Sequence, residues 1–309
     1  MAKTPPVSTY DVFFCDGYVW DLTFTGLPEM PRLGTEIFGS GFQMTPGASF
    51  YSAVAFHRLG LRAGWSVDIG NDPLSRFFLE TAQQEGLDCS LIRIRDFPIF
   101  SVTTSLSFPH NRAFVTYANE PPSTPLMPLI EQYHPRLLLL SSLGSGLRSI
   151  EWLAAIRKAG TKIFLECQVH QTSLDNPDVI YALQSVDIFA PNEQEALELT
   201  GAADVEAALA KLAELTPLVV IKLGPLGAIA KVNGKVVHVP VLRVKVLDTT
   251  GAGDIFNTGF IYGYLGGEPI EKCLMYGNIC GGLSTTGYGV RNAPTIAQVK
   301  GEMSHYAMK

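Results

Sequence analysis

One stretch of the sequence has residue types and spacing suited to phosphoryl chemistry: Asp248-Thr249-Thr250-Gly251-Ala252-Gly253-Asp254. The apolar, glycine-spaced segment that follows, Ile255 to Leu265, predicts a helix whose first turn contains Gly251, Ala252 and Gly253. Amides in a first helical turn have no intrahelical partner and lie at the positive end of the helix dipole. Small residues let an anion approach those amides closely. The stretch therefore predicts an anion-binding helix start.

Asp254 would lie one residue into this helix, close to the bound anion. A carboxylate in that position commonly stabilises the helix start, and it is also well placed to remove a proton from an alcohol that attacks a phosphoryl group. A dinucleotide-binding Gly-x-Gly-x-x-Gly loop would require glycine where the chain has Phe256. A Walker loop is excluded because the sequence contains no Gly-Lys-Ser/Thr. Phosphoryl transfer to an alcohol is therefore the leading hypothesis.

The elements that would position these residues alternate between strands and helices. Short apolar runs predict strands, and segments with helical spacing lie between them. The expected strands are Leu137–Ser141, Lys162–Leu165, Val186–Ala190, Leu218–Ile221 and Val241–Leu247, and the expected helices are Glu151–Ala159, Glu193–Leu199 and Ala202–Leu215. Strands that are apolar throughout and separated by helices predict a parallel sheet covered on both faces.

Two regions in the N-terminal half are poor in helix signals and rich in β-forming residues. They lie within about residues 16–44 and 97–120, and the second contains a predicted hairpin formed by Val102–Phe108 and Arg112–Tyr117. Neither region is long enough to form a domain alone. We expect both to contribute strands to one small sheet that projects from the α/β body as a lid.

The bulk composition excludes several classes of protein. The 309 residues carry a formal net charge of −6 and no run rich in Lys or Arg, so a nucleic-acid-binding surface is not expected. No apolar run approaches the ~20 residues that cross a bilayer, and Met1–Pro6 has no apolar core of a signal peptide. The five cysteines are scattered without a Cys-x-x-Cys motif, which is typical of a reducing compartment. We therefore expect a cytoplasmic enzyme.

The Asp248–Asp254 stretch resembles the Asp-Thr-x-Gly-Ala-Gly-Asp signature of the ribokinase-like (PfkB) carbohydrate kinases. Further segments resemble other motifs of that family in the same order along most of the chain. They are Pro31–Glu36, Ala53–Gly60, Ile69–Asp72, Asn192–Glu195, Lys222–Ala228, Asn278 and Ser284–Gly289. The resemblance implies a single domain over residues 1–309. It also implies a ribokinase-like three-layer sandwich with a central, mostly parallel sheet and a small β lid.

The resemblance also implies a role for each matching residue. Asp254 would be the general base, and the amides of Gly251, Ala252 and Gly253 would receive the developing phosphoryl charge. The residues implied to bind the ATP are Asn192, Lys222, Gly224, Gly227 and Asn278.

Two cation sites follow from the same resemblance. Glu195, with Asn192, would hold Mg²⁺ through water, in keeping with the reluctance of magnesium to lose its hydration shell. Asp248 and the carbonyl of Thr250 would belong to a site for a monovalent cation such as K⁺. Taken without the resemblance, Asn192 and Glu195 are a helix cap with a first-turn acid, and Gly224 and Gly227 form a plain turn.

The acceptor side departs from the family pattern. Asp21 resembles the aspartate that binds substrate hydroxyls, but the glycine expected five residues earlier is Asp16. Gly47 is retained from the Gly-Gly-x-x-x-Asn motif, whereas its asparagine is replaced by Tyr51. A tyrosine keeps a hydrogen-bonding tip and adds a ring, so it suits a substrate with a flat or apolar portion. It is equally consistent with helix packing.

A kinase for the hydroxymethyl group of a small sugar is the function expected from these observations. A nucleoside is the alternative acceptor, supported by Phe50, Tyr51, Phe100 and Phe108. A non-catalytic relative that binds nucleotide or a partner would be expected to have lost Asp254 or the glycines before it, and all are intact. The resemblance further implies a homodimer formed through the lid.

Overall fold

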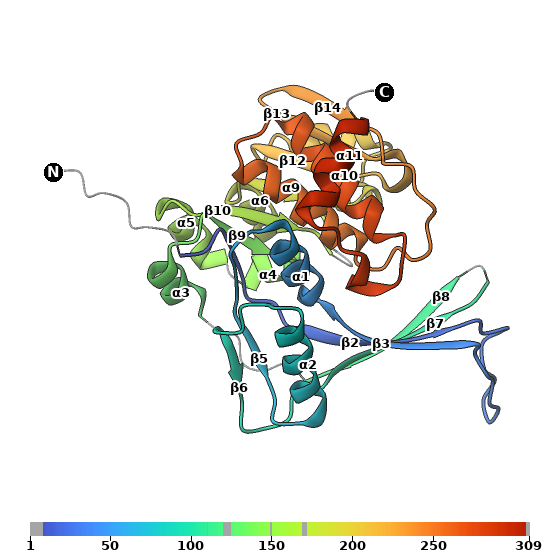
Figure 1. The fold of residues 1–309 in the computed structure, drawn as a ribbon. Helices are drawn as coiled ribbons and strands as arrows, with labels where there is room; N and C mark the ends of the chain where they lie inside the picture. The colour runs from blue at the N-terminus through green and yellow to red at the C-terminus, as the bar shows by residue number, and fades with distance from the viewer. Residues whose placement is uncertain (1–8, 110, 120–124, 149, 169–171, 307–309) are drawn as a thin grey trace.

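The computed structural model describes residues 9–109, 111–119, 125–148, 150–168 and 172–306. An eight-stranded sheet runs through the body of the molecule (Figure 1). In spatial order its strands are β14 (Lys235–Val239), β13 (Ala228–Val232), β12 (Leu218–Lys222), β11 (Ile188–Ala190), β10 (Lys162–Glu166), β9 (Leu137–Leu140), β1 (Val12–Phe14) and β4 (Ala63–Trp65). All neighbours from β4 to β12 are parallel, and β13 and β14 extend the sheet in antiparallel fashion.

Helices cover both faces of this sheet. The helices are α1 (Ser49–Leu59), α2 (Pro73–Gln84), α3 (Leu126–Tyr133), α4 (Leu143–Arg148), α5 (Ile150–Lys158), α6 (Pro177–Gln184), α7 (Glu193–Thr200), α8 (Val205–Leu212), α9 (Ala252–Leu265), α10 (Ile270–Ser284) and α11 (Ile296–Tyr306). Successive side chains of a strand point to opposite faces. Val12 and Phe14 therefore belong to one core cluster and Phe13 to the other. The predicted three-layer α/β sandwich is confirmed.

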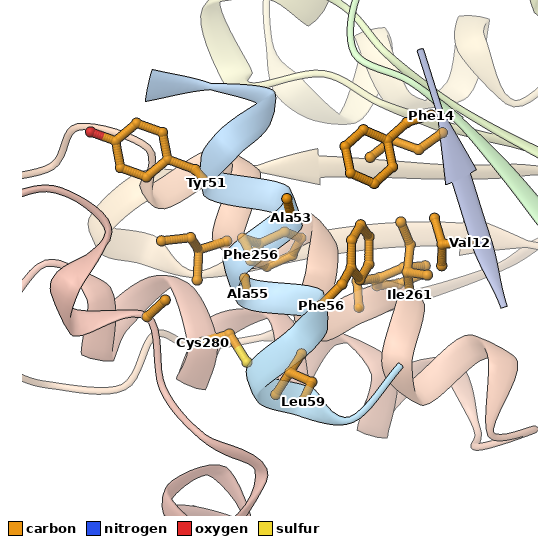
Figure 2. Close-up of a cluster of buried hydrophobic side chains, with 14 of the residues drawn as sticks. Val12, Phe14, Tyr51, Ala53, Ala55, Phe56, Leu59, Phe256, Ile261 and Cys280 are labelled. Atoms are coloured by element: carbon orange, nitrogen blue, oxygen red, sulfur yellow. The ribbon is translucent and has the colours of Figure 1, made fainter. Parts of the chain in front are cut away.

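The layer formed by α1, α9 and α10 packs tightly and carries the start of α9. Figure 2 shows Phe56 and Leu59 of α1 among side chains of β1, α9 and α10. Burying large apolar side chains of this kind stabilises the fold by ~1.5–3 kcal/mol each. This packing fixes the position of the Asp248–Asp254 stretch relative to the sheet.

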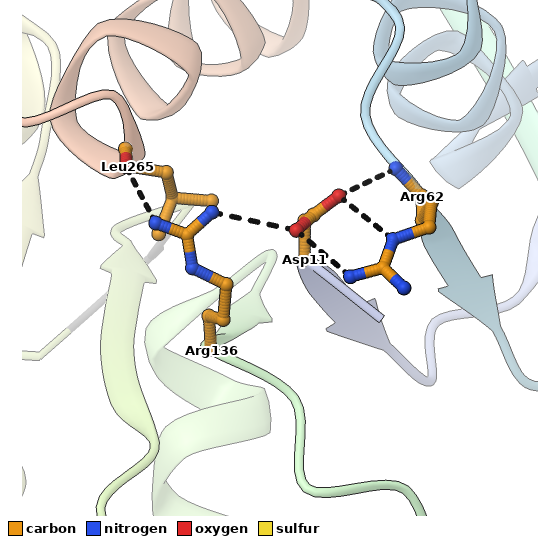
Figure 3. A network of polar contacts seen from close by, with 4 residues as sticks. All are labelled: Asp11, Arg62, Arg136 and Leu265. Carbon is orange, nitrogen blue, oxygen red and sulfur yellow. Dashed lines mark hydrogen bonds and ion pairs between the residues drawn. The ribbon is translucent and has the colours of Figure 1, made fainter. Parts of the chain in front are cut away.

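Polar contacts tie the opposite end of α9 to the sheet. Asp11, which precedes β1, accepts hydrogen bonds from the guanidinium groups of Arg62 and Arg136 (Figure 3). Arg136 also donates to the carbonyl of Leu265, the last residue of α9. A guanidinium at a helix C-terminus complements the helix dipole. The helix that carries Asp254 is thus held at both ends.

A separate four-stranded sheet projects from the body (Figure 1). Its order is β3 (Gly41–Ala48), β2 (Tyr18–Thr25), β7 (Ser101–Ser107) and β8 (Arg112–Ala118). The predicted hairpin is confirmed as the antiparallel pair β7–β8. The first predicted segment ended at residue 44, four residues short of the end of β3. We refer to this sheet as the lid. The short strands β5 (Val67–Ile69) and β6 (Ile92–Ile94) pair beside it.

The strand predicted over Val241–Leu247 was wrong. This segment forms no strand and runs across the surface toward α9. Pro240 has no amide hydrogen to continue a ladder, and the carbonyls of Val239 and Pro240 accept hydrogen bonds from the side chain of Asn278. Partial alternation of apolar residues therefore did not produce a strand. None of the helices in the described part of the chain combines the length and apolar character that spanning a bilayer requires.

Candidate active site

The start of α9 has the geometry expected of an anion-binding turn. Gly251 caps the helix with φ 72°, a left-handed conformation that disfavours side chains. A Cβ added to Gly251 would lie 2.8 Å from the ring of Tyr51. The amide of Ala252 already donates to the Thr249 carbonyl at 3.2 Å, which makes it a weaker candidate for anion binding than its neighbours. The first-turn geometry and the small residues otherwise suit a phosphoryl group.

Asp254 lies in the first turn of α9 and faces a group of charged side chains. Burial raises the pKa of its carboxyl to about 6, Lys222 opposes that shift, and the charges of Asp16 and Glu195 add to it. A pKa near the working pH is what a general base requires. The raised pKa and the first-turn position of Asp254 are those expected of the predicted base, and the role itself stays a prediction.

Lys222, at the end of β12, lies at the centre of this group. Its Nζ is 3.9 Å from Oε1 of Glu166 and 3.5 Å from Oδ1 of Asn257. A Cβ on Gly253 would lie 3.7 Å from the same Nζ, so the ammonium lies against the helix start. A cation in this place can stabilise negative charge on a group bound at the turn.

Glu166 is a member of the site whose importance the sequence reasoning missed. It ends β10, is 4% exposed, and burial raises its pKa to about 8, with Lys222 opposing the shift. Its sequence signal was a charged residue at the carboxyl end of an otherwise apolar parallel strand, where ligands commonly bind. The Glu166 Oε2 accepts a hydrogen bond from the side-chain amide of Gln168 at 3.2 Å.

Asn192 and Glu195 form a reciprocal cap at the start of α7. The Asn192 side chain accepts from the Glu195 amide at 2.9 Å, and the Glu195 Oε2 accepts from the Asn192 amide at 2.8 Å. The structural interpretation of this pair is therefore confirmed. Both residues also line the same cavity as Asp254. Within the described residues, no three acidic, histidine or cysteine side chains converge closely enough to bind a metal ion directly.

A cavity of about 840 Å³ extends from the start of α9 to the turn between β12 and β13. Lys222, Gly224, Gly227 and Asn278 all line it, so the structure brings the predicted nucleotide-binding residues together. Gly227 has φ 93°, and a Cβ there would lie 2.1 Å from the carbonyl oxygen of Val239. Asn278 is 3% exposed, and its amide nitrogen holds the chain at Val239 and Pro240. Asn278 therefore contributes to the cavity wall mainly by holding the backbone at Val239 and Pro240 in place.

The lid strand β2 places Asp21 near Asp254. Burial raises the pKa of Asp21 to about 6, and the charges of Asp248 and Asp254 add to this effect. Gly47 pairs with the neighbouring Val19, and a Cβ on Gly47 would lie 2.2 Å from Oδ2 of Asp21. The glycine therefore makes room for the carboxylate. Asp21, Gly47 and Asp254 come together as the sequence suggested.

The aromatic residues near the lid differ from expectation. Tyr51 is 2% exposed and packs its ring against Gly251. Figure 2 shows Tyr51 at the start of α1. Burial raises the pKa of its phenol, and the charge of Asp21 adds to that shift. Phe50 is completely buried against Trp65 and Phe78. Phe50 consequently offers no surface to an acceptor, and this support for a nucleoside was wrong.

Arg112 of the lid strand β8 is a second residue that sequence reasoning missed. Its guanidinium donates to the hydroxyls of Thr250 at 3.1 Å and Thr249 at 3.0 Å. It also lies 3.5 Å from Oδ1 of Asp248. That carboxylate oxygen accepts from the amide and hydroxyl of Thr250 as well. Arg112 therefore links the lid to the chain immediately before the helix start.

Comparisons with known proteins agree with this architecture. The family model described as pfkB family carbohydrate kinase matches residues 46–296. A fructokinase of Klebsiella pneumoniae is 28% identical over 276 residues, which cover 82% of this chain and 90% of that protein. An uncharacterised sugar kinase of Archaeoglobus fulgidus is 40% identical over 115 residues, covering 37% of this chain and 46% of that protein.

Two solved structures show the same fold. Ribokinase of Arabidopsis thaliana, complexed with ribose and ATP, is similar with a TM-score of 0.81 and 22% identity, covering 95% of this chain and 98% of that one. A nucleoside kinase of Burkholderia thailandensis in complex with inosine has a TM-score of 0.76 and 17% identity, covering 96% and 99%. The chain belongs to the pfkB family of carbohydrate kinases and is thus a phosphotransferase with an alcohol group as acceptor.

Proposed function

We propose that this enzyme transfers the γ-phosphoryl group of ATP to a hydroxymethyl group of a small carbohydrate, with Asp254 as the general base. The position of Asp254 carries the proposal. It lines the cavity that contains Lys222 and Gly227, and it is close enough to the lid residue Asp21 for its charge to raise the pKa of that carboxyl. A base between a nucleotide site and an acceptor site has the arrangement that direct phosphoryl transfer requires.

The reaction follows from the groups at the start of α9. Asp21 would accept hydrogen bonds from acceptor hydroxyls and orient the hydroxymethyl group toward Asp254. Asp254 would take the hydroxyl proton as the oxygen attacks the γ-phosphorus. The first-turn amides at Gly251 and Gly253, together with Lys222, would stabilise the negative charge that spreads over the transferred group.

The nucleotide would lie in the cavity of about 840 Å³. Gly224 and Gly227 would allow the backbone to approach it, and Asn192 would lie near its phosphates. Magnesium fits this site through water, because the Glu195 Oε2 is used by the helix cap and the acidic side chains nearby leave excess negative charge. When bound, it would neutralise charge on the phosphates. Glu195 would orient its water shell.

A direct test is Asp254→Asn, assayed by ADP release over a panel of sugars. We expect nucleotide binding to persist and transfer to fall by several orders of magnitude, because the base is lost while the helix start is retained. Near-normal turnover by this variant would show that another group is the base. If the wild-type enzyme consumes no ATP with a broad panel, the remaining alternative is a non-catalytic relative that binds nucleotide.

A nucleoside is the second candidate acceptor. The solved nucleoside kinase bound to inosine has the same fold, and Phe100 of the lid is 37% exposed. Nucleosides in the same panel separate the two classes of acceptor.

Two accompanying proposals concern assembly and ions. Exposed apolar side chains on the lid, including Phe42, Phe114 and Val115, support a homodimer formed through this sheet. Analytical ultracentrifugation tests it, and a monomer at micromolar concentration contradicts it. A K⁺ site at Asp248 and the carbonyl of Thr250 stays a prediction, tested by comparing activity in potassium and in a tetraalkylammonium salt.

A further inference from the structure

A second cavity, of about 570 Å³, lies beside the proposed acceptor site and has no role in the transfer described above. It opens where β1 and β9 end, next to the lid. Its walls include Asp16, Val19, Ala48, Arg148 and Trp152. A volume of this size is in the range of pockets that bind drug-sized molecules.

Residues of the cavity adjoin residues of the acceptor site along the lid strands. Val19 and Asp21 are two residues apart in β2 and therefore face the same side of the sheet. Ala48 directly follows Gly47 in β3. Asp16 is also close enough to Asp254 that its charge adds to the main effect of burial in raising the pKa of the base. An acceptor whose hydroxyl lies at Asp254 would thus extend toward this cavity.

The polar groups of the cavity are arranged around Ser145. Its hydroxyl donates to Oδ1 of Asp16 at 3.3 Å, and it receives a hydrogen bond from Arg148 at 3.2 Å. Asp16 and Arg148 form no direct ion pair in the described part of the chain, so each retains hydrogen-bonding capacity toward a ligand. Burial raises the pKa of Asp16, and bonds from Ser141 and Ser145 oppose the shift.

Two features distinguish this cavity from a plain structural gap. Asp16 places a carboxylate in the wall of the cavity. Trp152 of α5 lines the cavity and is 37% exposed, which leaves its ring available for stacking. A hydrogen-bond acceptor, a guanidinium and an exposed indole are the groups that recognise a polar ring.

We propose that the acceptor carries a second ring, and that this ring binds between Asp16, Arg148 and Trp152. The ring donates hydrogen bonds to Asp16, accepts from Arg148 and stacks on the indole. A nucleobase and a second sugar share this chemistry. The inference rests on the proposed kinase function and narrows its substrate class to nucleosides or glycosides, in preference to free monosaccharides.

The test compares acceptors in matched pairs that share the phosphorylated ring. Ribose is compared with cytidine, uridine, adenosine and guanosine, and fructose with sucrose and related fructosides. We measure kcat/KM by ADP release and acceptor binding by calorimetry without nucleotide. We expect at least one two-ring acceptor to exceed its monosaccharide by about tenfold or more, as expected for new hydrogen bonds to charged groups. The preferred pair identifies the second ring.

Variants then locate the binding of that ring. Trp152→Ala removes the indole, and Arg148→Ala removes the guanidinium. Each should lower kcat/KM and affinity for the two-ring acceptor about ten- to a hundredfold while leaving the monosaccharide within about twofold. Lys158→Ala is the control, because it removes an exposed cation from α5 outside the cavity. The Lys158→Ala variant should prefer the two-ring acceptor over the monosaccharide by the same factor as the wild type.

The outcomes separate this inference from the proposed function. One outcome is that Asp254→Asn abolishes turnover while the wild-type enzyme prefers free monosaccharides to every two-ring partner. This result overturns the second-ring site and leaves the kinase function intact. An unchanged two-ring preference in both Trp152→Ala and Arg148→Ala also overturns the site. No turnover and no binding with any member of the panel refutes both proposals together.

Discussion

Replacing Asp254 by asparagine should raise the free energy of unfolding, relative to wild type, more at pH 8 than at pH 5, although it removes the proposed base. Burial raises the pKa of this carboxyl from 3.8 to about 6, with Lys222 opposing the shift. The folded protein therefore binds the proton more tightly than the unfolded chain does. The contribution of Asp254 to stability is fully present below pH 3.8 and is lost as pH rises through about 6.

The magnitude follows from the two pKa values. One pKa unit corresponds to ~1.36 kcal/mol, so the loss is ~3 kcal/mol at pH 8 and about half of that at pH 5. Asparagine does not titrate and does not suffer this loss. The free energy of unfolding of Asp254→Asn, relative to wild type, should therefore rise by on the order of 1–2 kcal/mol between pH 5 and pH 8. Differences in hydrogen bonding between asparagine and a neutral carboxyl are the same at both pH values and cancel.

Urea denaturation of both proteins at pH 5 and pH 8 measures this difference. Asp96→Asn, at an exposed position, is the control for removing one carboxylate away from the site. The reasoning is refuted if Asp254→Asn is equally or less stable relative to wild type at pH 8 than at pH 5. That result would mean that the pKa of Asp254 is no higher in the folded protein than in the unfolded chain.

Three other changes test separate parts of the site. The kcat/KM for the acceptor should fall about tenfold per pH unit below about pH 6, as Asp254 becomes protonated; a flat profile to pH 5 contradicts this. Gly227→Ala should raise the KM for ATP, because φ is 93° and the added Cβ would lie 2.1 Å from the Val239 carbonyl; an unchanged nucleotide titration counts against it. Arg112→Gln should lower kcat about tenfold, because it removes the hydrogen bond that links the lid to Thr249. The free energy of unfolding in urea should change little, because the side chain is exposed. A wild-type kcat in this variant would show that the link between the lid and Thr249 has no role in turnover.

The parts of the fold that the sequence predicted correctly depend on local signals. Apolar runs such as Leu137–Leu140 are short, continuous and followed by helices, so they specify buried parallel strands. The β7–β8 hairpin has alternating residues around a turn. The Gly251–Asp254 stretch combines small residues with a helix signal, and its geometry follows from the backbone alone.

The parts that the sequence did not predict depend on contacts between distant segments. Val241–Leu247 has strand-forming residues, yet it forms no strand. The side chain of Asn278 donates hydrogen bonds to the two carbonyls just before this segment, those of Val239 and Pro240. Arg112 gains its position through the lid, 137 residues away in sequence from Thr249. Glu166 acquires its raised pKa only when the fold buries it beside Lys222. A local sequence pattern cannot predict contacts between segments that lie so far apart in the chain.

The charges at the site explain why the proposed metal would matter beyond the phosphates. Burial is the main cause of the raised pKa of Glu166 and Asp254, and the charges of Asp16 and Glu195 raise both further, while Lys222 opposes them. A nucleotide alone would add more negative charge and would raise the pKa of Asp254 again, which would protonate the base at neutral pH. A nucleotide that carries a divalent cation would add less net negative charge and would raise the pKa of Asp254 less. The acidic surroundings of the proposed base would therefore favour productive binding of the metal-loaded nucleotide over the free one.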